Sequence, residues 1–266
     1  MGVGLIGGSL GQVLRRSKRY KVVGIARRSA TLRNAKALGA IDSGSTALSQ
    51  VSLADIVVVC TPVDTIVPLI NKIRPFLKPR AIVTDVGSIK GILDRQIKGV
   101  RFVGAHPLAG SHNTGVKAAR PDLFRGATCV LVPQDQTALK AVRDMWCTAG
   151  AKVLEMTAQA HDQAVAMTSH LPHVLAHALV HAVSKRPQQS ILKSLMAGSF
   201  RDVTRVASSD PEQWAQIFQA NLKNLRAGIR FFQAELRKLD RELPRSTLRA
   251  TLRKSQTYRK PLFNAF

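Results

Sequence analysis

The chain has 266 residues, of which 45% are hydrophobic and 5% aromatic, and its mean hydropathy is close to zero. This composition is typical of a folded globular protein and excludes a largely disordered chain. No stretch has the roughly 20 consecutive apolar residues that a membrane-spanning helix requires. The glycine-rich start lacks the charged and then apolar pattern of a secretory signal. We therefore expect a cytoplasmic protein with no membrane partner.

The charge is strongly positive, with 40 lysines and arginines against 16 aspartates and glutamates and a formal net charge of +24. The basic residues are spread along the chain, and aromatic side chains that could stack on bases are scarce. A basic balance alone provides only non-specific attraction to phosphates. We expect no specific nucleic-acid partner, and a positive cleft would also suit an anionic substrate and cofactor. A basic nucleotide- or nucleic-acid-binding module without turnover is the non-enzyme alternative.

The first motif in the chain is a glycine pattern, Gly2-Val3-Gly4-Leu5-Ile6-Gly7. A GxGxxG turn lets the backbone approach a pyrophosphate, and the N–H groups of the following helix then face the anion. An amphipathic segment and an apolar one follow, as a dinucleotide-binding fold requires. We therefore expect cofactor contacts at Gly2, Gly4, Leu5, Ile6 and Gly7. The strand that should precede the turn is missing, so either the natural chain begins upstream or the site is impaired, and we expect the former.

The end of the next apolar segment bears on the choice of cofactor. NAD sites usually place Asp or Glu there to hold the ribose 2′-hydroxyl. This chain instead has Ala26-Arg27-Arg28-Ser29. Guanidinium groups could bind a 2′-phosphate, so we expect NADP to be favoured, with NAD as the alternative and with Arg27 and Arg28 as contacts. The competing interpretation is that both arginines are solvated surface residues.

The first 150 residues alternate apolar and amphipathic segments. Runs rich in Val and Ile, without polar alternation, predict strands buried on both faces of a parallel sheet, at 21–26, 54–62, 80–88, 101–107 and 128–133. Amphipathic segments predict helices at Gly8–Arg19, Ser29–Leu38, Val63–Leu77 and Thr137–Ala149. This alternation indicates a doubly wound α/β sheet.

The pattern changes near Met156, after which long amphipathic segments cover 159–184, 188–206 and 211–242. We expect a dinucleotide-binding domain over residues 1–156 and an all-α domain over residues 157–243. Residues 244–266 are basic and have few apolar anchors. We expect this C-terminal tail to form a short helix and a loose end.

Three stretches fall at the ends of expected strands, where ligands bind in open α/β sheets. They are Cys60-Thr61-Pro62, DVGSIK at 85–90 and HPLAGS at 106–111. Thr61 and Pro62 are candidate cofactor contacts. A histidine beside a cofactor can titrate near neutral pH and accept a hydroxyl proton. His106 is therefore a candidate base, although taken alone it could equally be a structural histidine at a turn.

A metal site is a further possibility, because a series of histidines recurs at helical spacing: His170, His173, His177 and His181. Pro172 interrupts the series, and no carboxylate or cysteine accompanies it, whereas zinc sites gather three or four clustered ligands. The cysteines are scattered and lack CxxC spacing, which indicates a reducing compartment. We therefore predict no metal site.

Five motifs follow one another along the chain: GVGLIGGSL, DVGSIK, HPLAGS, SHLPH (169–173) and GSFRDVTRVASSDPEQW (198–214). In this order and spacing, from residue 2 to about residue 235, the chain resembles the prephenate/arogenate dehydrogenase family. The resemblance implies a Rossmann-type domain followed by a helical dimerisation domain, and hence a homodimer. It also implies NAD(P)-dependent oxidative decarboxylation of prephenate to 4-hydroxyphenylpyruvate in tyrosine biosynthesis. Arogenate, which would give tyrosine directly, is the alternative substrate.

The same resemblance implies roles for single residues. His106 would be the catalytic histidine that hydrogen-bonds the ring hydroxyl of the substrate, and Ser88 would link it to the nicotinamide side. Arg205 would bind a substrate carboxylate. The other implied substrate contacts are Ser111, His173, Gly198, Arg201 and Trp214.

Two residues depart from the family pattern, namely Ala26 in place of an acid and His112 where relatives often carry glutamate. A different two-domain enzyme, such as a β-hydroxyacid dehydrogenase or an imine reductase, shares the glycine turn and the helical second domain. Such an enzyme would not be expected to carry HPLAGS followed by SHLPH.

Overall fold

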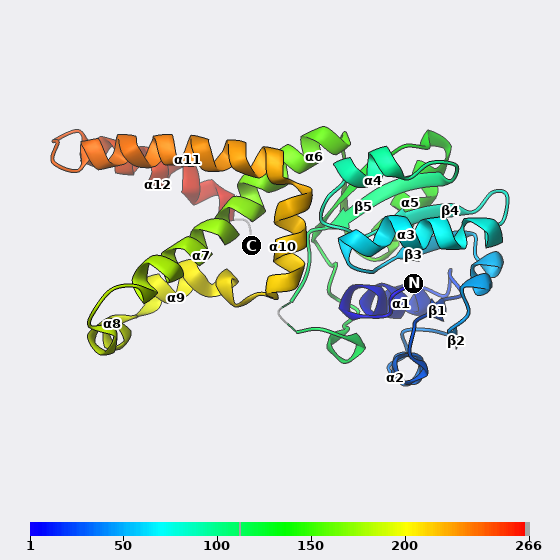
Figure 1. Cartoon of the computed structure of the whole chain (residues 1–266). Helices are drawn as coiled ribbons and strands as arrows, with labels where there is room; N and C mark the ends of the chain where they lie inside the picture. The colour runs from blue at the N-terminus through cyan, green and yellow to red at the C-terminus, as the bar shows by residue number, and fades with distance from the viewer. Residues whose placement is uncertain (112, 264–266) are drawn as a thin grey trace. The chain divides into compact units, whose positions relative to one another are not determined.

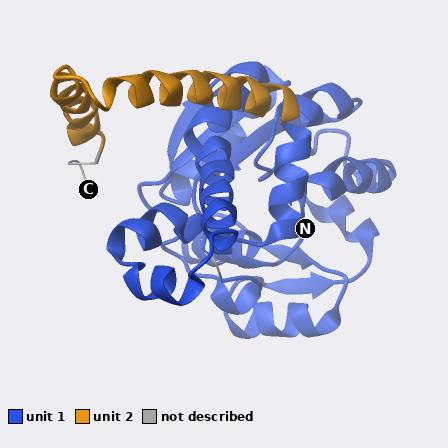
Figure 2. Ribbon diagram, turned by 60° about the vertical axis from the view of Figure 1, so that its left-hand side comes forward, with its two compact units in different colours: residues 1–221 blue, residues 222–266 orange. Residues whose placement is uncertain are grey.

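The computed structural model describes residues 1–111 and 113–263, and the departure noted at His112 lies outside these residues. Two compact units make up the chain, unit 1 over Met1–Asn221 and unit 2 over Leu222–Phe266 (Figures 1 and 2). Unit 1 begins with an α/β part and ends with a series of helices. The sites analysed below lie in unit 1.

A five-stranded sheet forms the centre of the α/β part, in the order β3-β4-β5-β6-β7. Its strands are β3 (Ile56–Val59), β4 (Ile82–Asp85), β5 (Arg101–Pro107), β6 (Thr128–Pro133) and β7 (Lys152–Glu155). Most residues of β4, β5 and β6 are buried, as their runs of Val and Ile predict. The expected α/β class is confirmed.

One strand pair departs from the expected parallel arrangement. β5 runs antiparallel to β6, with His106 opposite Val130, whereas the other pairs of this sheet are parallel. A parallel return needs a long crossover, usually a helix. Residues 108–127 supply only a short 3-10 turn, η3 (Val116–Ala118), among their described residues. The chain therefore turns back beside β5.

A second sheet pairs β1 (Val23–Ile25) with β2 (Ser43–Ser45) in parallel. The sequence does not predict β2, because Ser-Gly-Ser carries no apolar signal. Residues 1 and 2 connect the two sheets, since the Gly2 N–H donates to the Ile25 carbonyl at 3.0 Å and the Cys60 N–H donates to the Met1 carbonyl at 2.8 Å. The described residues that precede α1 form no strand. Where a first strand was expected, these two backbone hydrogen bonds link β1 to the residue that follows β3.

The helices of the α/β part are α1 (Leu5–Arg16), α2 (Ser29–Ala37), α3 (Val63–Ile73), α4 (Gly91–Gln96) and α5 (Gln136–Thr148) (Figure 1). α2 packs against β1 and β2, and the other four helices flank the five-stranded sheet. Two short 3-10 turns, η1 (Leu48–Leu53) and η2 (Arg74–Phe76), flank β3 and α3. One hydrophobic cluster, around Leu10 and Trp146, joins α1 and α5 to the sheet. Another, around Ile66 and Leu93, joins α3 and α4 to it. Apolar burial on both faces is the main force that holds this arrangement.

The rest of unit 1 is helical, as expected, with α6 (Ala158–Val165), α7 (Leu171–Ser184), α8 (Gln189–Leu195), α9 (Gly198–Thr204) and α10 (Pro211–Ala220). A π-helical turn, η4 (Ala166–His170), joins α6 to α7, and a 3-10 turn, η5 (Arg205–Ser208), follows α9. Such π turns are rare and often occur at functional sites. α7 packs against both α9 and η5.

Unit 2 contains α11 (Leu222–Glu242) and α12 (Leu248–Phe263). The helix expected over 211–242 is therefore interrupted at Asn221, and most of the expected tail is helical. In the part of the chain that the structure describes, no helix is both long and apolar enough to span a bilayer.

Candidate active site

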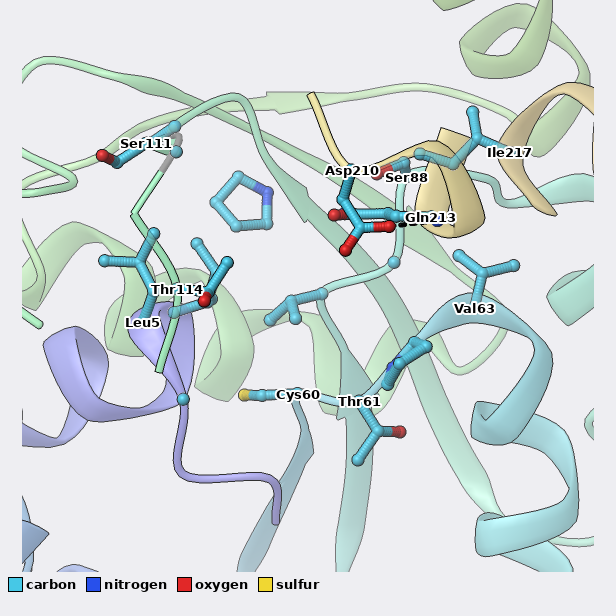
Figure 3. Close-up of a pocket in the computed structure, with 18 of the residues that line it drawn as sticks. Leu5, Cys60, Thr61, Val63, Ser88, Ser111, Thr114, Asp210, Gln213 and Ile217 are labelled. Carbon is cyan, nitrogen blue, oxygen red and sulfur yellow. Dashed lines mark hydrogen bonds between the residues drawn. The ribbon is translucent and has the colours of Figure 1, made fainter. Parts of the chain in front are cut away.

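A cavity of about 470 Å³ opens where β3, β4 and β5 end. Figure 3 shows side chains from several elements around it, including Leu5 of α1, Val63 of α3 and Gln213 of α10. Residues that directly follow β3 and β4, together with the end of β5, complete the wall. The cavity thus lies where parallel α/β sheets bind their ligands.

The cavity brings together many of the residues predicted from the sequence. Its wall includes Gly4, Leu5, Ile6, Thr61, Pro62, Ser88, His106 and Ser111. Ser88 is half-buried in the loop after β4, and the Ser111 hydroxyl accepts a hydrogen bond from the Asn113 N–H at 3.2 Å. Segments far apart in the sequence therefore meet here, as strand-end motifs of one sheet edge should.

A second cavity, of about 920 Å³, shares Gly4, Thr61 and Pro62 with the first. Arg27 and Arg28 lie in its wall, and both are exposed. After β1 the chain runs Ala26-Arg27-Arg28 without an acid, and the carboxylate in this wall is that of Asp64 in the first turn of α3. The arginines therefore face a space continuous with the glycine turn.

The glycine turn fits the pyrophosphate of a dinucleotide. Gly2 has a φ of +80°, and a Cβ there would lie 2.4 Å from the Cys60 carbonyl oxygen. A Cβ on Gly7 would lie 2.4 Å from the Gly2 carbonyl oxygen. Gly4, in contrast, would have no atom within 4 Å of its Cβ, so its backbone faces open space. Because α1 begins directly afterwards, its unpaired N–H groups point toward that space.

His106 lies near the end of β5 and is half-buried in the cavity wall. Its Nδ1 is 2.8 Å from Nε2 of His161 on α6, and the two rings meet edge to face. His161 Nδ1 is in turn 2.8 Å from Oδ1 of Asp162. Burial, and then the neighbouring His161, Lys90 and His170, lower the pKa of His106 well below its ordinary value of 6.5. The ring is therefore neutral at pH 7.

A buried ion pair lies between the last residue of β4, Asp85, and Lys90, which directly precedes α4. Lys90 Nζ lies 2.5 Å from Asp85 Oδ2, and the two side chains are 1% and 0% exposed. The Asp85 carboxylate also accepts the N–H of Gly87 at 2.7 Å and that of Ala105 at 3.1 Å. These bonds fix the loop that carries Ser88 beside the strand that carries His106. Burial lowers the pKa of Lys90, and the charge of Asp85 opposes that shift.

A second cluster of predicted residues lies on the helices of unit 1. Trp214 of α10 stacks on His173 of α7, with ring centroids 3.3 Å apart. Burial, and then the charges of His177, His170 and Arg205, lower the pKa of His173 to about 4. Arg205 is the first residue of η5, which packs against α7. His173 Nδ1 is buried and has no hydrogen-bond partner among the described residues. Three predicted substrate contacts are thus close together, but they do not line the cavity of His106.

The two remaining predicted substrate contacts, Gly198 and Arg201, line neither cavity. Arg201 is exposed and forms a loose ion pair with Asp202 at 3.7 Å. In the histidine series, His170 is buried and faces Trp214 edge-on at 6.0 Å, whereas His181 is exposed. The described residues contain no group of three or more His, Cys, Asp or Glu side chains that could hold a metal ion.

Sequence reasoning missed the residues that support or complete the cavity. His161 and Asp162 stand behind His106, and their signal is an adjacent pair of polar residues on a helix face that also buries Ala158 and Val165. α10 adds Glu212, Gln213 and Gln216 to the wall, and Asp210, which directly precedes this helix, adds its carboxylate. The Asp210 carboxylate also caps α10, since it accepts the Gln213 N–H at 3.0 Å.

The chain matches two family profiles. Residues 10–155 match the one described as "Prephenate dehydrogenase, nucleotide-binding domain", and residues 157–254 match "Prephenate dehydrogenase, dimerization domain". A curated relative, the cyclohexadienyl dehydrogenase of Zymomonas mobilis, is 34% identical over 250 residues, which cover 90% of this chain and 85% of that protein.

Solved structures agree with the sequence matches. Prephenate dehydrogenase from A. aeolicus, in complex with hydroxyphenyl propionate and NAD+, is 34% identical, with a TM-score of 0.92 and coverage of 98% of this chain and 96% of that one. Synechocystis arogenate dehydrogenase is 32% identical, with a TM-score of 0.87 and coverage of 98% of both chains. The similarity therefore extends through the α/β part and the helices.

The buried ion pair makes a prediction about stability. We expect Lys90→Met to lower the free energy of unfolding by about 3–5 kcal/mol, because it leaves the Asp85 carboxylate buried without its counter-charge. Urea unfolding followed by circular dichroism measures this change. Lys78→Met is the matched control, since Lys78 and Asp55 form a pair of similar length, 2.7 Å, in which Asp55 is 90% exposed. Equal free energies of unfolding for the two variants would show that the buried pair does not stabilise the fold more than the exposed pair does.

Proposed function

Because the chain belongs to the prephenate dehydrogenase family of oxidoreductases, we propose that it converts prephenate to 4-hydroxyphenylpyruvate in tyrosine biosynthesis. The observation that carries this proposal is the position of the His106 imidazole in the wall of a cavity that also includes the glycine turn. Burial, which lowers the pKa of this ring, favours its neutral form. Arogenate, which would yield tyrosine, is the alternative substrate, and the similarity to an arogenate dehydrogenase supports keeping it.

The reaction needs a proton acceptor at the ring hydroxyl. NAD(P)+ held at the turn of Gly2, Gly4 and Gly7 would supply the hydride acceptor for the carbon that carries this hydroxyl. His106 accepts the hydroxyl proton, and a carbonyl begins to form at that carbon. The bond to the ring carboxylate then breaks, carbon dioxide leaves, and its electron pair completes the aromatic ring. The ring oxygen takes the proton back from His106, which gives the phenol and restores the neutral imidazole. A base that is already neutral at pH 7 can accept the hydroxyl proton without first losing one of its own.

The substrate is a dianion and needs a fixed positive charge. We assign its carboxylate to Arg205, because a guanidinium can bind a carboxylate through two parallel hydrogen bonds. The packing of η5, which begins at Arg205, against α7, which carries His173 of the His173–Trp214 stack, supports this assignment. Ser111, Gly198 and Arg201 are the further proposed substrate contacts, and Ser88 is proposed to connect His106 to the nicotinamide side.

The cofactor is NAD(P), and the finer proposal is that NADP is favoured. Arg27 and Arg28 in the second cavity, and the lack of a carboxylate at Ala26, support a site for a 2′-phosphate. A relative of known structure binds NAD+, so NAD is proposed as a weaker cofactor of this chain.

The assembly follows from the second family match. The match to a dimerisation domain supports a homodimer that acts on a small molecule. A cytoplasmic location and the lack of a specific nucleic-acid partner stay predictions.

The role of His106 is tested by His106→Asn. We expect kcat with prephenate to fall about 10²- to 10⁴-fold, because the proton acceptor is lost, while substrate binding is largely retained. A spectrophotometric assay of NADP and NAD reduction measures turnover with prephenate and with arogenate. The exposed His181 provides the control variant His181→Asn, which should keep the parent rate. Unchanged turnover in His106→Asn would remove the base from this mechanism.

The role of Arg205 is tested by Arg205→Ala. We expect the KM for prephenate to rise about 10- to 100-fold, since a hydrogen-bonded charge pair with the substrate is lost. Arg186→Ala, at an exposed arginine just after α7, is the control. If both variants have the parent KM, Arg205 does not contact the substrate.

The cofactor preference is tested by Arg27→Ala and Arg28→Ala. Each substitution should raise the KM for NADP about tenfold and leave the KM for NAD nearly unchanged, because only NADP carries the 2′-phosphate. Initial-rate kinetics with both cofactors provide the comparison, and Arg33→Ala on the exposed face of α2 is the control. A parallel loss for both cofactors would contradict a 2′-phosphate site.

A further inference from the structure

We propose that His161 and Asp162 are positioning residues that fix which ring nitrogen of His106 carries its proton. The inference rests on the proposed function of His106 as the base. It concerns two residues that no sequence motif singled out. Both lie on α6, within the match to the second family domain, whereas His106 lies on β5 of the first.

The three side chains form a continuous line of hydrogen bonds. His106 Nδ1 is 2.8 Å from His161 Nε2, and His161 Nδ1 is 2.8 Å from Asp162 Oδ1. The His161 side chain is 0% exposed and that of Asp162 is 8% exposed. A line of this kind is shielded from water, so each donor must face an acceptor within the protein.

The Asp162 carboxylate at the end of this line determines which group donates and which accepts in each hydrogen bond. Asp162 accepts the N–H groups of Lys90 and Gly91, each at 2.8 Å, in addition to the bond with His161. Burial raises its pKa, but these hydrogen bonds outweigh burial, and the pKa of Asp162 lies below its usual range. An ionised carboxylate only accepts hydrogen bonds. His161 Nδ1 must therefore carry a proton and donate it to Asp162.

The position of the proton on His161 then determines the position of the proton on His106. A neutral histidine has one protonated and one unprotonated ring nitrogen. With its proton on Nδ1, His161 presents Nε2 as an acceptor, and His106 must donate from Nδ1. The proton of His106 is thus on the side away from the substrate. Its Nε2 has no hydrogen-bond partner among the described residues, and its ring lines the cavity.

This direction matters for catalysis. With the opposite tautomer, His106 would present an N–H to the substrate hydroxyl and could not accept its proton. The same line stabilises the imidazolium that forms after transfer, since the Asp162 carboxylate lies at its far end. The charges of Lys90 and His170 also act on His106, and Asp85, which pairs with Lys90, offsets the charge of that lysine. Asn221 anchors α6 by donating to the Asp162 carbonyl at 2.7 Å.

Two substitutions of His161 separate the two hydrogen bonds. The amide of glutamine lies near the position of Nε2 in histidine and can accept from His106. The amide of asparagine lies near Nδ1 and can reach Asp162 only. We expect His161→Asn to lower kcat about 100-fold with the substrate KM nearly unchanged. His161→Gln should retain at least about a tenth of the parent kcat. Equal losses in both variants, or no loss in His161→Asn, would overturn the proposal.

The tautomer itself is observable without turnover. In protein labelled with ¹⁵N-histidine, the chemical shifts of protonated and unprotonated ring nitrogens differ, and His106→Asn identifies the signals of His106. We expect an Nδ1–H tautomer in the parent protein and in His161→Gln, and a loss of that preference in His161→Asn. A parent protein with the proton on Nε2 overturns the inference whatever the assay gives. Full turnover of His106→Asn would instead overturn the proposed function and leave the tautomer result standing.

Discussion

Burial of one imidazole at the end of β5 determines what the cavity can do. Desolvation penalises the charged form of His106, and the nearby cationic and histidine side chains act in the same direction, so the ring is held neutral at pH 7. A neutral imidazole beside a nucleotide-binding turn can accept a proton as hydride leaves. The rest of unit 1 matters to the proposed chemistry because it keeps this half-buried ring largely desolvated, oriented and in contact with the cavity.

Two features of the fold place the ring. The antiparallel return from β5 to β6 brings the segment after His106 back over the sheet edge, where Ser111 and Thr114 join the cavity wall. The buried pair of Lys90 and Asp85 ties the loop of Ser88 to β5. α6 then adds His161 and Asp162 from the helical part of unit 1. The cavity and the hydrogen bonds behind it therefore draw residues from both matched family domains.

The sequence predicted the parts of the site that depend on local patterns. The glycine turn, the strand-end motifs and the alternation of helix and strand follow from neighbouring residues, and they gave the α/β class and most of the cavity wall. The direction of β6 was missed, although the lack of a helix between residues 107 and 128 was visible in the sequence. His161 and Asp162 could not be assigned, because their role depends on a contact across 55 residues. Arg205, His173 and Trp214 were grouped by resemblance alone, and the structure places them together but outside the cavity of His106.

The pH dependence of kcat/KM tests the central claim most directly, because it reports the ionisation of the free enzyme's base. A pKa lowered by burial means that His106 stays unprotonated, and able to accept a proton, as the pH falls through 6.5. With saturating cofactor, we predict that kcat/KM for prephenate is level from pH 8 down to 6.5 and falls only well below that value. An acidic limb centred at or above pH 6.5 would contradict the account, since it would mean that the imidazole is not held neutral by its surroundings.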